Sequence, residues 1–210
     1  SLIEERTLAS CRVGLCDGDA PQREFYGHMS NFGRGKRMQG PMVDTIVRGG
    51  TVVTSSAAFK AAVAIKGEQI AAVGAEETLP PAVDYIDATG KYVLPGAIDC
   101  HLHLGGVDDW TVGPLAAAKA GITTIVPFAT VDETREEPLP DAVRRMKAQV
   151  SQESVVDFGF HFILPNLPYV LDGLPEAMEE GVSSFKLFMT YKKAGIRMCS
   201  DSFIGKAMQI

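Results

Sequence analysis

The chain has 210 residues, of which 46% are hydrophobic and 22% charged, and its 26 acidic and 20 basic residues give a formal net charge of -6. This composition excludes a collagen, a coiled coil and a wholly disordered chain, and the length suffices for one large domain or two small ones. Because the excess charge is negative and long basic runs are missing from the sequence, we expect no nucleic acid and no membrane as partners.

Cysteine usage and the lack of apolar segments indicate the compartment. The four cysteines show no C-x-x-C spacing, so they predict neither a zinc ribbon nor a redox pair, and we expect a reducing environment. The first residues lack the apolar core of a signal peptide, and no run of about 18 uncharged apolar residues occurs. The sequence therefore predicts a soluble, cytoplasmic protein.

The first 92 residues fall into two parts. Residues 1–41 show no sustained period of 2 or 3.6, so we expect an irregular N-terminal extension, with Met42 as the ancestral start. Residues 42–92 are rich in β-branched residues and include a hairpin pattern over 61–73 with Gly67 in the turn. A Thr89-Gly90 turn closes what reads as a small antiparallel unit, too thin to be a whole domain.

From residue 93 to 210 apolar strands alternate with helical stretches. Candidate strands start near Val93, Ile122, Val155 and Val182, which are 29, 33 and 27 residues apart. This spacing matches the roughly 30-residue βαβ unit and indicates parallel strands. We expect strands 1–4, the first half of a (β/α)8 barrel, with a doubly wound open sheet as the alternative. Helix signals lie between and after the strands: Leu139, Val143, Met146 and Val150; Pro175; and a Ser200-Asp201 cap.

Two histidines end the first barrel strand. His101 and His103 are two residues apart, so they project from the same face, with Asp99 behind them, at the end of the strand where barrel enzymes place their sites. Two imidazoles at this spacing can bind one metal ion. Without further context, paired histidines can also be polar residues that merely end a strand.

A lysine interrupts the fourth apolar strand. Lys186 lies within Val182–Met189, and burial disfavours its charged form, leaving an amine that can react with carbon dioxide. The resulting carbamate has two anionic oxygens and suits a bridge between two cations. The alternative is a lysine whose stem packs on the sheet while its charge reaches water.

These motifs together resemble a known family. Sequence resembling the cyclic amidohydrolases, closest to hydantoinases and dihydropyrimidinases, runs from about Met42 to Ile210. The motifs that carry it are PGAIDCHLH at 95–103, AGITT at 120–124, DFGFH at 157–161 and SFKLFMTY at 184–191. The resemblance implies an α/β protein: part of a β-sandwich over 42–92, followed by part of a metal-dependent TIM barrel over 93–210.

The same resemblance implies the site and its chemistry. His101 and His103 would bind the more buried metal, and Lys186, carboxylated by carbon dioxide to N6-carboxylysine, would bridge two divalent ions, usually zinc. Tyr191 would hydrogen-bond the substrate carbonyl as charge develops; otherwise it is an aromatic residue closing the strand end. A hydroxide between the two metals would then attack a ring amide carbonyl of a small cyclic amide or ureide substrate. From its place in the strand rather than from the resemblance, we expect Asp99 to orient a histidine, with a solvated residue at the strand end as the alternative.

The remaining implications concern scope. Family members carry two more histidine ligands and an aspartate on later strands, so we expect this chain alone to be inactive, and the complete protein to be a homotetramer. Allantoinase and dihydroorotase remain alternatives, as do an inactive fragment and a non-catalytic scaffold of the same fold; the presence of His101, His103 and Lys186 argues against the scaffold. We expect His161 to pack or hydrogen-bond inside the barrel rather than to bind metal.

Overall fold

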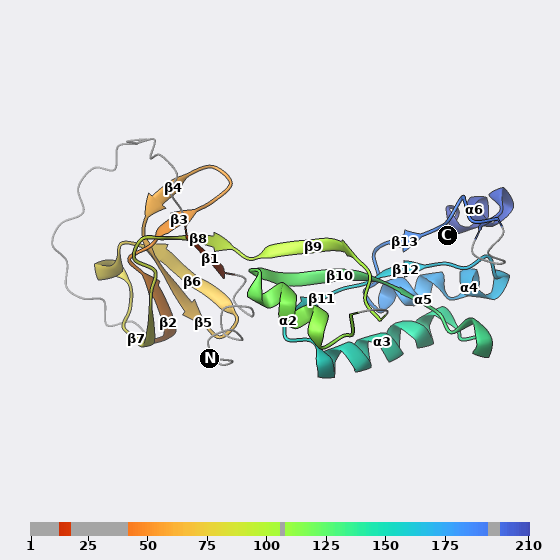
Figure 1. The fold of residues 1–210 in the computed structure, drawn as a ribbon, viewed down its shortest axis with the longest axis horizontal. Helices are drawn as coiled ribbons and strands as arrows, with labels where there is room; N and C mark the ends of the chain where they lie inside the picture. Colours follow the sequence, from red (N-terminus) through yellow and green to blue (C-terminus); the bar gives the residue numbers. More distant parts are fainter. Residues whose placement is uncertain (1–12, 18–41, 106–107, 193–197) are drawn as a thin grey trace. The chain divides into compact units, whose positions relative to one another are not determined.

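The computed structural model describes residues 13–17, 42–105, 108–192 and 198–210. The chain divides into two compact units, Ser1–Ala97 and Ile98–Ile210, each of which has its own sheets and core (Figure 1). No helix in the described ranges is long and apolar enough to cross a membrane.

The first unit consists of two four-stranded sheets, with the orders β1-β8-β3-β4 and β6-β5-β2-β7. Both sheets are mixed, because β3 pairs parallel with β8 and β2 parallel with β7, while the other pairs are antiparallel. The elements are β1 (Val13–Asp17), β2 (Val43–Arg48), β3 (Thr51–Val53), β4 (Ala58–Lys60), β5 (Ala62–Lys66), β6 (Gln69–Gly74), the 3-10 turn η1 (Glu76–Thr78), β7 (Ala82–Asp87) and β8 (Lys91–Pro95).

One apolar core joins the two sheets of the first unit. Val47 of β2 and Val63 and Ile65 of β5 pack in one cluster with Val52 of β3 and Val93 of β8, and all five are buried. Burial of each such side chain contributes about 1.5–3 kcal/mol. The two sheets therefore form a sandwich.

The turns of this unit confirm one sequence prediction and correct another. Gly67 adopts a φ of 58° in the β5–β6 hairpin, as the pattern predicted, and its N–H donates to Asp44 Oδ2 at 2.6 Å. The prediction that Thr89-Gly90 closes an antiparallel unit is wrong. Gly90, with a φ of 78°, leads from β7 in one sheet to β8 in the other, so this turn carries the chain across the sandwich.

The start of the chain and the boundary between the units also differ from expectation. The segment expected to be irregular contains β1, whose Val13 lies opposite Pro95 of β8; the rest of residues 1–41 lies outside the described part. Its short pattern did not predict a strand because its partner is far along the chain. The units meet after Ala97 rather than near residue 93, since Val93 belongs to β8 and a new strand begins beyond Gly96.

The second unit has strands in four positions, in the order in which they occur along the chain. Strand β10 pairs with β9 and pairs parallel with both β11 and β12, two parts of one interrupted strand, and β12 pairs parallel with β13. The prediction of a strand at Ile122 is confirmed, whereas the next two begin a few residues after Val155 and Val182. The strands are β9 (Ala97–Leu102), β10 (Ile122–Thr130), β11 (Asp157–Phe158), β12 (His161–Ile163) and β13 (Phe185–Lys186).

Helices separate these strands (Figure 1). The four apolar positions predicted to share a face of the longest helix are all buried. The Ser200 cap is confirmed, since its hydroxyl accepts from the N–H of Phe203 at 3.2 Å. The helices are α2 (Val112–Lys119), α3 (Leu139–Glu153), α4 (Pro168–Asp172), α5 (Leu174–Glu179) and α6 (Asp201–Ala207), with the 3-10 turn η2 (Glu133–Arg135) after β10.

The sheet of the second unit has one covered and one more open face. Alternate residues of β10 from Thr123 to Ala129 are buried, and Ala129 and Phe162 pack in one core with helix α3. The strand order shows none of the reversal that defines a doubly wound sheet, so it matches part of a barrel and disfavours the alternative. Phe128 lies opposite His161, and Ile163 opposite Lys186, which places these residues on the other face.

Candidate metal centre

The two histidines of the H-x-H motif lie side by side at the end of β9. Their ring centres are 5.9 Å apart with an angle of 76° between the rings, and both side chains are exposed. Two imidazoles bonded to one tetrahedral zinc ion at about 2.0–2.1 Å place their ring centres about 5 Å apart. The pair formed by His101 and His103 is therefore close to the geometry that a shared metal ion requires.

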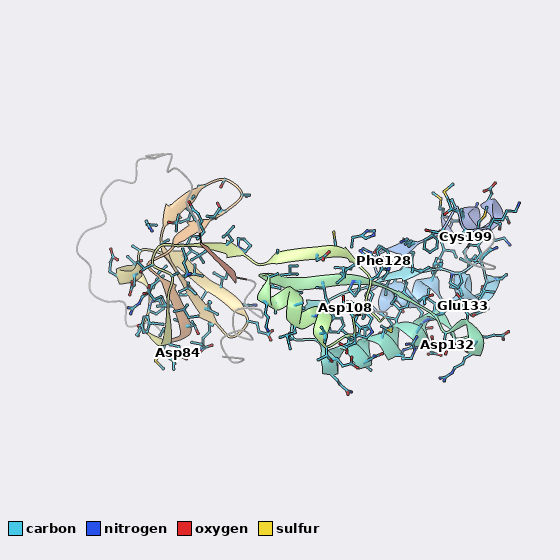
Figure 2. The ribbon with its side chains drawn as sticks, viewed as in Figure 1. Asp84, Asp108, Phe128, Asp132, Glu133 and Cys199 are labelled. Atoms are coloured by element: carbon cyan, nitrogen blue, oxygen red, sulfur yellow. The ribbon has the colours of Figure 1, made fainter. Side chains whose placement is uncertain are left out.

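Phe128 of β10, labelled in Figure 2, is the aromatic residue that the polar groups singled out from the sequence surround. Its ring centre is 4.8 Å from that of His101, 4.9 Å from that of His103 and 4.9 Å from that of His161. Lys186 Nζ lies 4.2 Å from the same ring centre. The structure thus gathers both histidines of the motif and the lysine around one aromatic ring.

Lys186 is half-buried in β13 and points to the face that carries this ring. Its Nζ also lies 4.8 Å from the ring centre of Phe188, so two aromatic rings face the amine. Aromatic faces attract a cation and shield it from water. The lysine therefore lies among apolar groups while still within reach of the histidine pair.

The electrostatics favour a neutral His103. Although the His103 side chain is exposed, partial desolvation by the groups packed around it lowers its pKa below the ordinary value, and the positive charge of Lys186 and the neighbouring His101 lower the pKa further. A metal ion binds the neutral imidazole and not the imidazolium. The site therefore favours the form of His103 that binds metal.

The sequence prediction for His161 agrees with the structure. Its Nδ1 is hydrogen-bonded to Ser184 Oγ, and its Nε2 lies 2.9 Å from the carbonyl oxygen of Cys100. Both ring nitrogens have protein partners, so His161 packs and hydrogen-bonds inside the site. Asp99 contacts the main chain: its Oδ1 accepts from the N–H of His101 at 3.1 Å.

Tyr191 lies five residues beyond the lysine, with 58% of its surface exposed. It adopts a φ of 68°, and its ring meets that of Phe188 edge-on with the centres 5.3 Å apart. Left-handed backbone costs a residue other than glycine about 1–2 kcal/mol, and such strain is found at functional sites. Among the described residues its hydroxyl has no hydrogen-bond partner.

The donor set fits a metal in part. Two neutral imidazoles and a lysine that can be carboxylated supply nitrogen and oxygen ligands of the kinds that zinc accepts. Within the described ranges, no group of three or more His, Cys, Asp and Glu side chains is close enough together to hold a metal ion. That His101, His103 and Lys186 bind metal therefore stays a prediction from the sequence.

Phe128 and Ser184 were not singled out from the sequence. Phe128 occupies an ordinary position in an apolar strand, and Ser184 has no motif that marks it as a hydrogen-bond partner. Only the register between β10, β12 and β13 brings them to the site.

No family model matches the sequence, but individual proteins do. D-hydantoinase of Geobacillus stearothermophilus is 38% identical over 156 residues, which cover 70% of this chain and 32% of that protein. D-hydantoinase of Rhizobium radiobacter is 36% identical over 167 residues, covering 76% and 35%. The chain is a homologue of these D-hydantoinases. It spans about a third of the length of these relatives.

Solved structures of hydantoinases and a dihydropyrimidinase are also similar to this chain. The crystal structure of dihydropyrimidinase from Brevibacillus agri NCHU1002 is 36% identical, with a TM-score of 0.68 over 77% of this chain and 36% of that chain. An L-hydantoinase from Arthrobacter aurescens is 28% identical, with a TM-score of 0.69 over 80% and 38%. These neighbours have the amidohydrolase TIM-barrel fold, and the parallel sheet of the second unit matches part of it.

Proposed function

We propose that this chain carries the first metal-binding strands of a hydrolase that opens cyclic amides, of the hydantoinase or dihydropyrimidinase type. The observation that carries the proposal is the convergence of His101, His103 and Lys186 on the ring of Phe128. Relatives named D-hydantoinase, 36–38% identical, support this chemistry over that of an allantoinase or a dihydroorotase. The ligand residues argue against a non-catalytic scaffold.

Each residue has a defined role in this proposal. His101 and His103 would hold one divalent ion, which we propose to be zinc, and Lys186 would react with carbon dioxide to form a carbamate that could ligate a second ion. In that reaction the amine nitrogen bonds to the carbon of carbon dioxide and gives up a proton. Two such ions, when bound, would supply an acidified water molecule and polarisation of the substrate carbonyl. The carbamate balances their charge within the apolar surroundings of Phe128 and Phe188.

Tyr191 serves the substrate rather than the metal. Its exposed hydroxyl and left-handed backbone suit a residue that donates a hydrogen bond to the carbonyl oxygen as negative charge develops there. The remaining ligands and the proton acceptor would come from strands beyond those described. By family resemblance we propose that the complete enzyme is a cytoplasmic homotetramer.

The test is to measure metal content and ring opening in the longest open reading frame that contains residues 1–210. Wild-type protein, Lys186→Ala and Lys206→Ala are prepared with zinc and bicarbonate, and hydrolysis of hydantoin and dihydrouracil is followed. Lys206 is an exposed lysine on α6 and serves as the matched control. We expect Lys186→Ala alone to lose zinc and activity together. Two zinc ions and full activity in Lys186→Ala would contradict the carbamate.

A further inference from the structure

A histidine outside the candidate ligand set connects the strands that carry it. His161 Nε2 lies 2.9 Å from the carbonyl oxygen of Cys100 on β9, and Nδ1 is hydrogen-bonded to Ser184 Oγ, beside β13. A carbonyl oxygen only accepts, so Nε2 carries the proton. In the neutral ring Nδ1 then accepts from the serine hydroxyl. The two bonds therefore use both ring nitrogens and define one tautomer.

The bond to Cys100 acts on the peptide group next to a ligand. That carbonyl belongs to the peptide unit whose N–H is the N–H of His101, and this N–H donates to Asp99 Oδ1 at 3.1 Å. The peptide unit is thus held at both ends, by His161 and by Asp99. Fixing it restricts the backbone rotation that aims the His101 ring.

The bond to Ser184 acts near the other ligand. Ser184 lies two residues before Lys186, so in an extended chain both side chains project from the same face. His161 is half-buried, and the ring of Phe128 packs against it with the centres 4.9 Å apart. The imidazole of His161, on β12, therefore connects β9, which carries the histidine pair, with β13, which carries Lys186. Strand β10, which carries Phe128, lies between β9 and β12.

We propose that His161 is a positioning residue that sets the spacing between the His101 pair and Lys186 before metal binds. This inference rests on the proposed function, because it concerns the same metal centre. Residues that hydrogen-bond to ligand groups commonly change metal affinity 10–100-fold when removed. Here the effect is exerted through the Cys100 bond on the main chain of His101, whereas the Ser184 bond fixes the tautomer in which Nε2 carries the proton; neither bond involves the metal.

Two substitutions separate the two bonds. In His161→Gln the amide nitrogen occupies the level of Nε2 and can still donate to Cys100, whereas in His161→Asn the amide oxygen occupies the level of Nδ1 and can only accept from Ser184. Thr124→Val is the control, because Thr124 lies on the same face of β10 as Phe128 and its buried Oγ1 has no hydrogen-bond partner in the described structure. Zinc affinity is measured by titration with bicarbonate present, and amide hydrogen exchange at His101 is measured without metal.

We expect His161→Asn to bind zinc about 10–100-fold more weakly than wild type and to speed exchange at the His101 amide. His161→Gln and Thr124→Val should stay within a few-fold of wild type in both measurements. Equal effects of the two His161 variants, or none, would overturn the positioning role while the metal centre stands. Wild-type protein that binds no zinc would instead overturn the proposed function and this inference with it.

Discussion

Replacing Phe162 by alanine tests whether the sheet and helices of the second unit share one core. Phe162 is fully buried, and it packs in one cluster with Leu139 and Val143 of α3. Deleting a buried phenylalanine ring costs about 3–5 kcal/mol, a large share of the 5–15 kcal/mol that stabilises a typical domain. With a urea m-value of about 1.5 kcal/mol/M for a unit of this size, we expect the midpoint to fall by about 2–3 M.

The single tryptophan makes this measurement specific to the second unit. Trp110 is buried there and meets Phe160 edge-on with the ring centres 6.1 Å apart, so its fluorescence reports the loss of this core. Phe59→Ala is the control, since Phe59 is exposed on β4 of the first unit, and it should leave the transition unchanged. A fall of less than about 0.7 M for Phe162→Ala, or about 1 kcal/mol, would refute a shared core.

Two further predictions concern acid stability and turnover. Glu137→Gln should lower stability at pH 7 by about 1–3 kcal/mol, because the carboxylate accepts from Arg145 at 2.7 and 2.9 Å and from the N–H of Asp132 at 2.7 Å. The Arg145 hydrogen bonds, more than the hydrogen bond from the Asp132 N–H, hold the pKa of Glu137 below its ordinary value. The ionised carboxylate therefore stabilises the fold above the unfolded pKa of about 4.3, and this contribution is lost as pH falls through the lower folded pKa. Urea unfolding measured from pH 7 to pH 3 should therefore show a steeper fall of the unfolding free energy with pH for wild type than for Glu137→Gln. The control Asp141→Asn, which removes an exposed ion pair, should keep the wild-type pH dependence. The same pH dependence for wild type and Glu137→Gln would contradict the assignment. Tyr191→Phe in the active enzyme should reduce kcat about a hundredfold with unchanged Trp110 fluorescence transitions, and an unchanged kcat would show that its hydroxyl does not touch the reacting carbonyl.

Local patterns predicted the local structure of the second unit well. The apolar period of α3, the Ser200 cap and the strand at Ile122 depend on neighbours within a few residues, and the structure confirms each. Pairings between distant segments were not accessible in this way. The strand β1 and the transfer of Val93 to the sandwich depend on partners that the local sequence does not identify.

The site shows the same limit at the level of single residues. The strand period was enough to place His101 and His103 on one face, and the apolar run around Lys186 marked the lysine. Their meeting at Phe128 depends on register, because a shift of one residue between β10 and β12 would turn His161 to the helix-covered face. Motif spacing alone therefore could not identify Phe128.

Folding and the proposed metal site draw on different residues in this unit. The core between the sheet and the helices contains Phe162 and Leu139, which are fully buried. By contrast, the side chains of His101 and His103 are exposed and that of Lys186 is half-buried. Removal of exposed or half-buried side chains leaves little cavity, so ligand substitutions should cost far less stability than Phe162→Ala. Loss of zinc in Lys186→Ala can then be assigned to the missing ligand, since the Trp110 transition of that variant should match wild type in the absence of metal.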